Sequence, residues 1–513
     1  MAQELMIGLV GAIGVDLDEV TGALGRALHS VGYKSKAISL IEPVFGYDPW
    51  SNRPSPQHFD DRYNARMDAG NEFRAKLERA DALALLGMVS VEADRKAETG
   101  DEYRSPERFA YILRSLKTKA EVDTFRRVYG PNLVVVGAYS PKDHRRTTLA
   151  ERIARSHHDS NNDRHLPAAQ RLMLRDEIEH GNSFGQNVRD TFPLSDVFID
   201  AGSKITIEAG VTRFVEILFG HPFRTPRREE SGMLHAYAAG LRSASAGRQV
   251  GAAILTKDGD LVAVGTNEVA KAGGGQYWDG DDYDHRDHTQ PSDVASRLVE
   301  SILADTLARL KKKGWLEDAR AKRELSDLLA EARKELLKPM QRNASDLESL
   351  AESARFGHVI EYIRAVHAEM AALMSAARRG ISVQGCTLYS TAFPCHECAR
   401  HIVASGIAEV RFVEPYPKSR VSELFSDSIV VDAEGTRDHV TFRAYIGISP
   451  TRYMDLFVAP RRHDDDDKLI EWETIKGSTN PRLGNPLVSY LEREKEHVDL
   501  LNQLKKSKNI SGT

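Results

Sequence analysis

The stretch His367-Ala368-Glu369, together with Pro394-Cys395-His396-Glu397-Cys398, decides the fold of the C-terminal half of the chain. Between them, apolar residues over 368–379 recur with helical spacing, and a glycine follows to end the helix. Residues 386–391 have the composition of a strand, and a second helix is predicted over 395–405. The sequence therefore predicts helix, strand and helix. His367 starts the first helix, and both cysteines lie in the first turn of the second.

This arrangement supplies the ligands of a catalytic zinc ion. The positive end of a helix favours thiolate, so Cys395 and Cys398 lie where a metal-binding sulfur is stabilised. With His367 they give three tetrahedral Zn2+ ligands and leave the fourth position open for water, whose pKa zinc lowers towards about 7. Glu369 lies two residues from a ligand, so it can carry protons without binding the metal. We expect one catalytic zinc ion per chain.

The combined spacing HxE…PCxxC is the signature of zinc-dependent nucleobase deaminases. A structural zinc site would need a fourth ligand, and neither Cys386, in a strand, nor His396, inside the CxxC, is well placed. A thioredoxin-like redox pair would not explain the His-x-Glu motif. The residues favour a deaminase over both alternatives.

Before this motif, the chain shows the first elements of the same domain. A helix is predicted over 233–245, followed by strands at 249–256 and 261–265 with an Asp-Gly turn between them, which is typical of a hairpin. Residues 271–290 are rich in Gly, Asp and His, and 293–355 are helical and charged. The sequence predicts an insertion over 271–355, with its helical part packed on the core. The loop over 273–287, with the glycines at 273–275 as hinges, is a candidate lid over the site. His285 and His288 are candidate ligands of a second metal, but solvent exposure is the simpler expectation.

The N-terminal third is predicted to be a doubly wound α/β domain. Apolar runs alternate with a helix over 17–31. The expected strands are 5–10, 36–41, 82–86, 133–136 and 198–199. A Pro-rich basic stretch at 220–228 is the expected linker. The predicted domains are 1–225, 226–465 and a C-terminal tail, 466–513, that contains a polar helix over 490–508.

Gly8, Gly11 and Gly14 lie between the first strand and the first helix, where a phosphate-binding P-loop belongs. The Lys and the Ser or Thr of that motif are missing, which disfavours phosphoryl transfer. Backbone N–H groups could still hold a nucleotide. Two hypotheses stay open: a nucleotide sensor that gates the deaminase, which is preferred, and an inert scaffold. Arg145 and Arg146 are candidate phosphate contacts, or ordinary solvated side chains.

Composition narrows the class of protein. The 513 residues include 70 Lys and Arg against 75 Asp and Glu, a net charge of -5, so no global basic excess points to nucleic acid. With 3 cysteines, a disulfide framework is excluded and a reducing compartment is expected. No targeting or membrane-spanning segment is apparent, so we expect a cytoplasmic protein that does not bind membranes.

Residues 385–429 resemble the deaminase domain of bacterial anti-phage dCTP deaminases, and 112–130 and 137–147 are similar to the N-terminal part of that family. The resemblance implies an α/β protein with two parts. One is a degenerate P-loop-kinase-like domain, a P-loop-NTPase-like doubly wound parallel sheet. The other is a cytidine-deaminase-like α/β/α domain with a helical insertion. It also implies hydrolytic deamination of dCTP, dCMP or both to deoxyuridine nucleotides and ammonia, which depletes dCTP during phage infection.

The resemblance also suggests substrate contacts. Asn267 matches the Asn that holds the sugar in dCMP deaminases, although Thr266 replaces the usual Tyr; a turn-capping role is the alternative. Arg248 and Lys418 are candidate phosphate contacts, or solvated charges. Tyr416 is a candidate for stacking on the base, or it fills a strand end.

The expected partners follow from this assignment. They are a small deoxycytidine nucleotide as substrate, a nucleotide effector, further copies of the chain in a dimer or hexamer, and an inhibitory RNA or protein regulator. Two competing functions remain. A tRNA or single-stranded-DNA deaminase would need a basic track, which the net charge does not support. A regulated module with structural zinc would have no use for Glu369.

Overall fold

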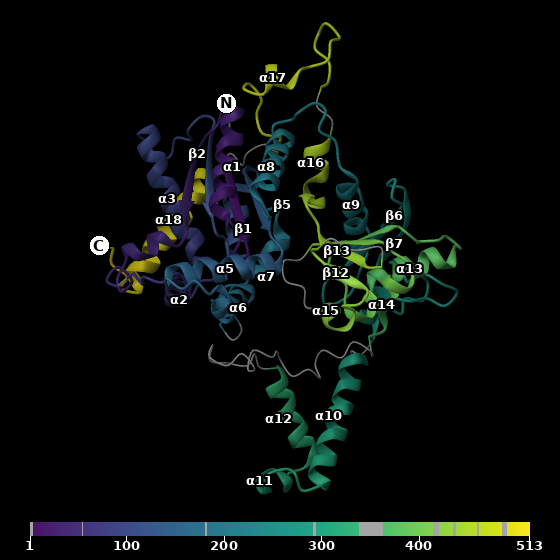
Figure 1. Cartoon of the computed structure of the whole chain (residues 1–513). Coiled ribbons are helices and arrows are strands. Elements are labelled where there is room, and N and C mark those ends of the chain that lie inside the picture. Colours follow the sequence, from purple (N-terminus) through teal and green to yellow (C-terminus); the bar gives the residue numbers. More distant parts are fainter. Residues whose placement is uncertain are drawn as a thin grey trace.

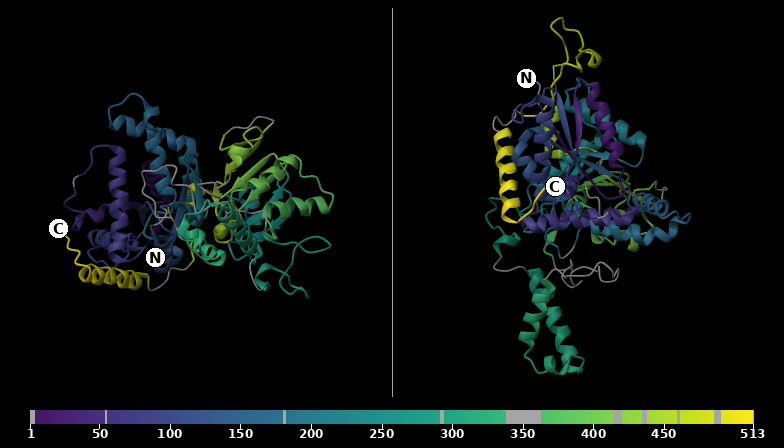
Figure 2. Two further views of the ribbon diagram at one scale, coloured as in Figure 1. Left: turned by 90° about the horizontal axis from the view of Figure 1, so that it is seen from below. Right: turned by 90° about the vertical axis from the view of Figure 1, so that its left-hand side faces the viewer.

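The computed structural model describes residues 4–53, 55–179, 182–290, 294–337, 363–413, 420–433, 438–458, 461–484 and 490–512. Within these ranges, the structure has two six-stranded sheets, each the centre of a lobe (Figure 1). A helical arm made of α10 (Val294–Lys312), α11 (Asp318–Ala321) and α12 (Leu325–Leu337) projects away from the lobes in Figures 1 and 2. The helical character predicted for the insertion is confirmed for the arm, and residues 338–362 lie outside the described part. The expected packing on the core is wrong for the described helices, because α10 and α12 pack on each other instead.

The first sheet has the strand order β14-β5-β4-β1-β3-β2. Its strands from the N-terminal part are all parallel, as predicted, and β14 joins the edge antiparallel to β5. The bounds are β1 (Leu5–Gly11), β2 (Lys34–Ser39), β3 (Phe109–Arg114), β4 (Leu133–Tyr139), β5 (Val197–Asp200) and β14 (Gly447–Ile448). Every residue of β1 is buried, because helices cover both faces of the sheet.

The two faces of this sheet carry separate apolar cores. Alternate residues of β1, such as Ile7 and Leu9, pack with α1 (Leu17–Ser30) and α8 (Lys204–Leu218). The intervening Met6 and Val10 belong to the core on the other face. That face is covered by α3 (Ala82–Thr99), α4 (Lys119–Tyr129) and α18 (Tyr490–Ser507). Helices α2 (Phe59–Leu77), α5 (Lys142–Ser156), α6 (Leu166–Glu177) and α7 (Val188–Thr191) complete the lobe.

One predicted strand of this lobe is wrong. Residues 82–86 form the first turns of α3, not a strand. This helix contacts α2, α4 and α18, so its apolar residues are buried around most of its circumference. A short block without polar residues has no periodicity that separates a buried helix from a buried strand. The predicted strand over 36–41 also shifts, to 34–39, because the pairing with β3 begins at Lys34.

The second sheet has the order β12-β13-β11-β10-β6-β7. The predicted hairpin is present, with β6 antiparallel to β7. The bounds are β6 (Gly251–Leu255), β7 (Leu261–Thr266), β10 (Thr387–Ser390), β11 (Glu409–Phe412), β12 (Ile429–Val431) and β13 (Val440–Ala444). Helix α9 (Arg228–Gly240) covers one face, and α13 (Ala368–Arg378) and α14 (His396–Ala404) cover the other. This is an α/β/α arrangement, as predicted.

Helix α9 begins five residues before the predicted start at 233. The Glu230 carboxylate accepts a hydrogen bond from the backbone N–H of Arg227 at 2.7 Å, which starts the helix there. The same carboxylate forms a buried, bidentate ion pair with Arg213 of α8 at 2.7 and 2.8 Å. It also accepts from the N–H of Ile448 in β14. Glu230 thus joins three elements at the boundary between the lobes.

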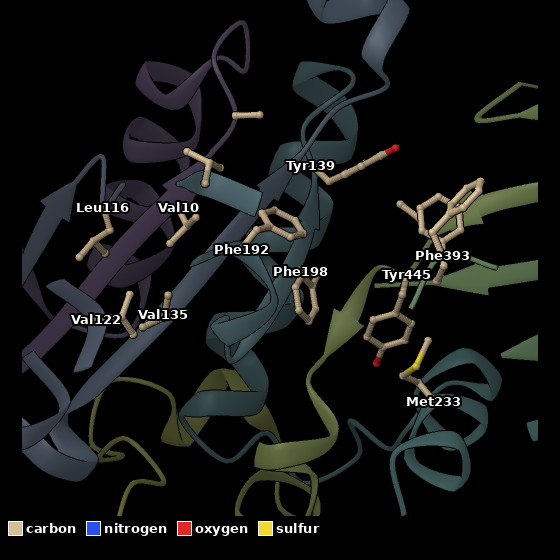
Figure 3. Close-up of a cluster of buried hydrophobic side chains, with 14 of the residues drawn as sticks. Val10, Leu116, Val122, Val135, Tyr139, Phe192, Phe198, Met233, Phe393 and Tyr445 are labelled. Carbon is tan, nitrogen blue, oxygen red and sulfur yellow. The ribbon is translucent and has the colours of Figure 1, made fainter. Parts of the chain in front are cut away.

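The two lobes share one apolar core. Phe198 of the first sheet packs edge-on against Tyr445, with ring centroids 5.8 Å apart. Figure 3 shows this core running from Val10 and Phe192 in the first lobe to Met233 in the second. The contact is therefore a packed interior and not a flexible linker between independent bodies.

The C-terminal helix α18 is clamped to the first lobe by a buried charge cluster. Arg95 of α3 donates hydrogen bonds to Glu4 at 3.0 Å and to Glu494 at 2.7 Å, and Tyr490 donates to Glu4 at 2.9 Å. All three charged side chains are almost fully buried. Burial alone would lower the pKa of Arg95, but its two carboxylate partners raise it. Figure 2 shows α18, in yellow, lying along the N-terminal lobe.

We expect Arg95→Leu to destabilise the protein by about 3–5 kcal/mol, because it leaves two buried carboxylates without a cation. Burial already raises the pKa of Glu494, and without Arg95 the folded state should favour the protonated Glu494 carboxyl still more. The deficit should therefore shrink as the pH falls and grow as it rises. Urea unfolding measured across pH checks this.

Adding Glu4→Gln and Glu494→Gln to the Arg95 variant should recover part of the loss, because no unpaired charge is then buried. Lys96→Leu on the same helix is the matched control, since Lys96 pairs with Glu102 at the surface and should change stability little. An Arg95 variant as stable as its Lys96 counterpart would contradict the clamp.

No helix in the described ranges has both the length and the apolar composition needed to cross a membrane.

The short elements near the second sheet are β8 (Glu268–Val269), β9 (Ala365–Val366), α15 (Val421–Leu424) and α16 (Tyr453–Phe457). Helix α17 (Trp472–Ile475) lies in the segment that leads to α18. Pairing of β8 with β9 attaches the segment that precedes His367 to the end of the hairpin.

Candidate active site and metal centre

Three side chains converge where α13 and α14 begin. His367 is the N-cap of α13, Cys395 is the N-cap of α14, and Cys398 lies in the first turn of α14. The Nδ1 atom of His367 lies 3.2 Å from Cys395 Sγ and 3.5 Å from Cys398 Sγ. The backbone N–H of Cys398 donates to the Cys395 sulfur at 3.4 Å. The predicted placement of these residues on two helix starts is confirmed.

The spacing of these atoms fits a tetrahedral zinc ion. With Zn–S and Zn–N bonds of about 2.3 and 2.05 Å, tetrahedral ligands place sulfur and nitrogen about 3.5 Å apart. The observed separations of 3.2 and 3.5 Å agree with that value. The three ligand atoms all lie within 4.8 Å of one another, and no other His, Cys, Asp and Glu group in the described ranges meets this criterion. The donor set, one imidazole and two sulfurs, is one that zinc prefers.

The lowered pKa of the Cys395 thiol favours the binding of a cation. A hydrogen bond with the Cys398 thiol lowers the pKa of Cys395, and His367 lowers it further despite burial. The same hydrogen bond, with burial, raises the pKa of Cys398. A bound cation would deprotonate both sulfurs. The Cys395 thiolate also raises the pKa of His367.

Glu369 lies on the first turn of α13, beside these ligands, and is 4% exposed. Its Oε2 atom is 3.5 Å from Cys398 Sγ, and its Oε1 atom accepts a hydrogen bond from Ser390 Oγ at 3.4 Å. Burial raises the pKa of this carboxyl group. Sequence reasoning missed Ser390. The available signal was its position two residues after Leu388, because residues two apart on a strand lie on the same face of the sheet. That face lies against α13, which carries Glu369.

A close approach of backbone to backbone fixes α13 over the sheet. A Cβ atom on Gly265 of β7 would lie 2.2 Å from the carbonyl oxygen of Ala368 and 2.3 Å from the amide nitrogen of Ala372. Only a glycine fits there, and α13 carries both His367 and Glu369. The small residue therefore sets the distance between the sheet and the site.

The predicted substrate residue Asn267 follows β7. Its Oδ1 atom accepts from the N–H of Val250 at 2.7 Å, and its Nδ2 group donates to the carbonyl of Arg248 at 2.9 Å. The side chain thus holds the chain before β6, as the turn-capping alternative requires, and the sugar contact stays a prediction. Arg248 is exposed in this turn. Tyr416 and Lys418 lie outside the described residues.

The loop after β8 folds against the residues that precede His367. Arg364 donates to Asp287 at 2.9 Å and to the carbonyl of His285 at 3.1 Å. Arg242 stacks over the ring of Trp278, 3.9 Å from its centroid. A Cβ on Gly274 would lie 2.6 Å from the side chain of Arg378, at the other end of α13 from His367, so the lid stays a prediction. Within the described ranges, His285 and His288 belong to no group of three metal ligands.

The predicted nucleotide-binding glycines lie in the other lobe, on β1 and in the loop that follows it. A Cβ on Gly8 or Gly11 would meet the side chain of Leu116 or Leu17, at 2.5 and 2.9 Å. Gly14 has φ +93° and packs against Arg145. The glycines therefore serve close packing within the lobe.

A protein-family model matches the part of the chain that contains the His/Cys/Cys cluster. Residues 226–414 match the model of the cytidine and deoxycytidylate deaminase zinc-binding region. This part of the chain, which contains the His/Cys/Cys cluster, is therefore similar to a deaminase zinc-binding region.

Curated relatives are similar over shorter stretches. The deoxycytidylate deaminase of Enterobacteria phage T2 is 44% identical over 55 residues, 11% of this chain and 29% of that protein. The deoxycytidylate deaminase of Pongo abelii is 37% identical over 87 residues, 17% of this chain and 44% of that protein. The chain thus spans less than half the length of these relatives. The solved dCMP deaminase of cyanophage S-TIM5 is 14% identical, with a TM-score of 0.22, over 43% of this chain and 99% of that one.

Proposed function

We propose that the chain deaminates deoxycytidine nucleotides, dCMP or dCTP, by hydrolysis to the corresponding deoxyuridine nucleotides and ammonia, and that this serves defence against phage. The observation that carries the proposal is the geometry of His367, Cys395 and Cys398, with the buried Glu369 beside them. A structural zinc site needs no such carboxylate.

His367, Cys395 and Cys398 would hold the zinc ion, which would act as a Lewis acid and lower the pKa of a water molecule. Glu369 accepts the proton that this water loses and delivers it to N3 of the cytosine ring. The water oxygen forms a bond to C4, and the bond between C4 and the exocyclic nitrogen breaks. Glu369 takes the second proton from the new hydroxyl on C4 and passes it to that nitrogen, so the products are the deoxyuridine nucleotide and ammonia. The raised pKa of Glu369 suits it to both transfers.

The nature of the substrate rests on two supports. Relatives named deoxycytidylate deaminases support a free deoxycytidine monophosphate. The resemblance of 385–429 and of the N-terminal segments to anti-phage proteins supports dCTP and a role against phage. Asn267, Arg248, Tyr416 and Lys418 are the proposed substrate contacts. A cytoplasmic setting, a dimer or hexamer, and an inhibitory RNA or protein stay predictions that rest on the same resemblance.

The test is to incubate the purified full-length, zinc-loaded protein with dCMP, dCTP, CTP, deoxycytidine and a cytosine-containing oligonucleotide, and to measure uracil products by chromatography. We expect product from dCMP or dCTP and none from the oligonucleotide. Product from the oligonucleotide alone would favour a polynucleotide deaminase instead. No product from any substrate would refute the proposed activity.

A further inference from the structure

The loop between β1 and α1, residues 12–16, lies where a P-loop would surround a phosphate, yet it already holds an anion. The backbone N–H of Ile13 donates a hydrogen bond to Oδ2 of Asp176 at 2.7 Å. Asp176 comes from α6, 163 positions later in the chain, and is fully buried. A carboxylate from the protein itself thus occupies the position on this loop that a phosphate oxygen would take.

The same carboxylate has a cation beside it. Lys117, which follows β3, donates from Nζ to Oδ1 of Asp176 at 2.7 Å and to the carbonyl of Gly11 at 3.0 Å. A loop N–H and a lysine ammonium are also the groups with which a P-loop binds phosphate. Asp176 receives both of them, one on each oxygen. A phosphate could not take either contact without breaking an ion pair that is mostly buried.

Other groups of the loop also form hydrogen bonds within the protein. The N–H of Val15 donates to the carbonyl of Ala12 at 3.2 Å, and the N–H of Glu19 donates to Oδ1 of Asp16 at 3.0 Å. Helix α1 is therefore capped by its own carboxylate. A Cβ on Gly14 would lie 2.9 Å from the Cβ of Arg145, so the loop packs directly on α5.

A second carboxylate, from the deaminase lobe, contacts the end of β4, the strand beside β1. Asp432, directly after β12, accepts a hydrogen bond from the hydroxyl of Tyr139, the last residue of β4. Arg145, a candidate phosphate contact, is 1% exposed, and its Nε donates to the carbonyl of Ser140 at 3.0 Å. The edge where nucleotides bind in doubly wound sheets is thus occupied by residues of both lobes.

We propose that Asp176 is a built-in substitute for the nucleotide phosphate, and that the N-terminal domain is a nucleotide-independent scaffold for the deaminase lobe. Of the two hypotheses for this domain, the contacts favour the scaffold over the sensor. This inference does not depend on the proposed deaminase activity, since it concerns a different lobe and is read out by binding and stability.

The test uses the full-length protein and its Asp176→Ala variant, with melting temperatures measured in Mg-ATP, Mg-GTP, inorganic phosphate and acetate. We expect none of these to change the melting temperature of the wild type. The variant should melt several degrees lower, because Ile13 and Lys117 lose their anion, and millimolar phosphate or acetate should restore much of the loss. The double variant Asp176→Ala/Lys117→Met should show no such recovery.

Asp163→Ala is the matched control, because this carboxylate lies nearby in the chain but is exposed, and it should neither melt lower nor respond to anions. Stabilisation of the wild type by ATP or GTP, or their binding to it in equilibrium dialysis, would overturn the proposal. So would an Asp176→Ala variant as stable as the wild type. If that variant does not fold, Asp176→Asn takes its place, with the dialysis of the wild type as the deciding measurement.

Discussion

Glu369→Gln should abolish deamination while zinc stays bound. The amide keeps the size of the side chain and its contact with Ser390, but it cannot accept a proton from water. General acid–base catalysis contributes about 10²–10⁴-fold, and both transfers here use one group, so kcat/KM should fall at least that far. Steady-state kinetics with the active nucleotide, with zinc counted by elemental analysis, measures both quantities.

Glu397→Gln is the matched control. Glu397 lies inside the same CxxC motif, but its carboxylate pairs with Arg400 on the surface of α14, away from the proton transfers. We expect its activity and zinc content to match those of the wild type. If the Glu369 variant were about as active as the Glu397 variant, Glu369 would not be the proton carrier.

Gly265→Val should be the most damaging single change outside the ligands. Its Cβ would fall within 2.3 Å of two backbone atoms of α13, and backbone cannot move aside as a flexible side chain can. Overpacking a core typically costs about 1–3 kcal/mol, and here the helix that moves carries His367 and Glu369. We expect a lower urea midpoint, a loss of bound zinc and no measurable deamination.

The control is Gly477→Val, because a Cβ at this exposed glycine meets no atom within 4 Å. Its stability and zinc content should stay unchanged. If Gly265→Val retained wild-type zinc and stability, the close approach of β7 to α13 would not determine the geometry of the site.

The site was predictable from sequence because its information is local. Each motif combines ligand chemistry with a helix start, so His367, Cys395 and Cys398 could be placed before any tertiary contact was known. The hairpin of β6 and β7 was predictable for the same reason, since an Asp-Gly turn between apolar runs specifies it.

What could not be predicted depends on contacts between distant residues. Asp176 reads as an ordinary helical carboxylate until the fold brings it to the N–H of Ile13. Helix α3 reads as a strand because three other helices cover it. Strand β14 has only two residues, too short for any period, and its pairing with β5 joins segments that lie far apart in the chain.

That pairing has a consequence for the order in which the protein is made. The first sheet is incomplete until β14, which begins at residue 447, has been synthesised. Its partner strand β5 ends much earlier, at Asp200. Helix α18, which covers the same lobe, comes later still. At about 5–20 residues per second, the ribosome needs roughly 12–50 s to cross that interval. Most of the second lobe is synthesised in this time, so the first sheet has an open edge until β14 pairs with β5.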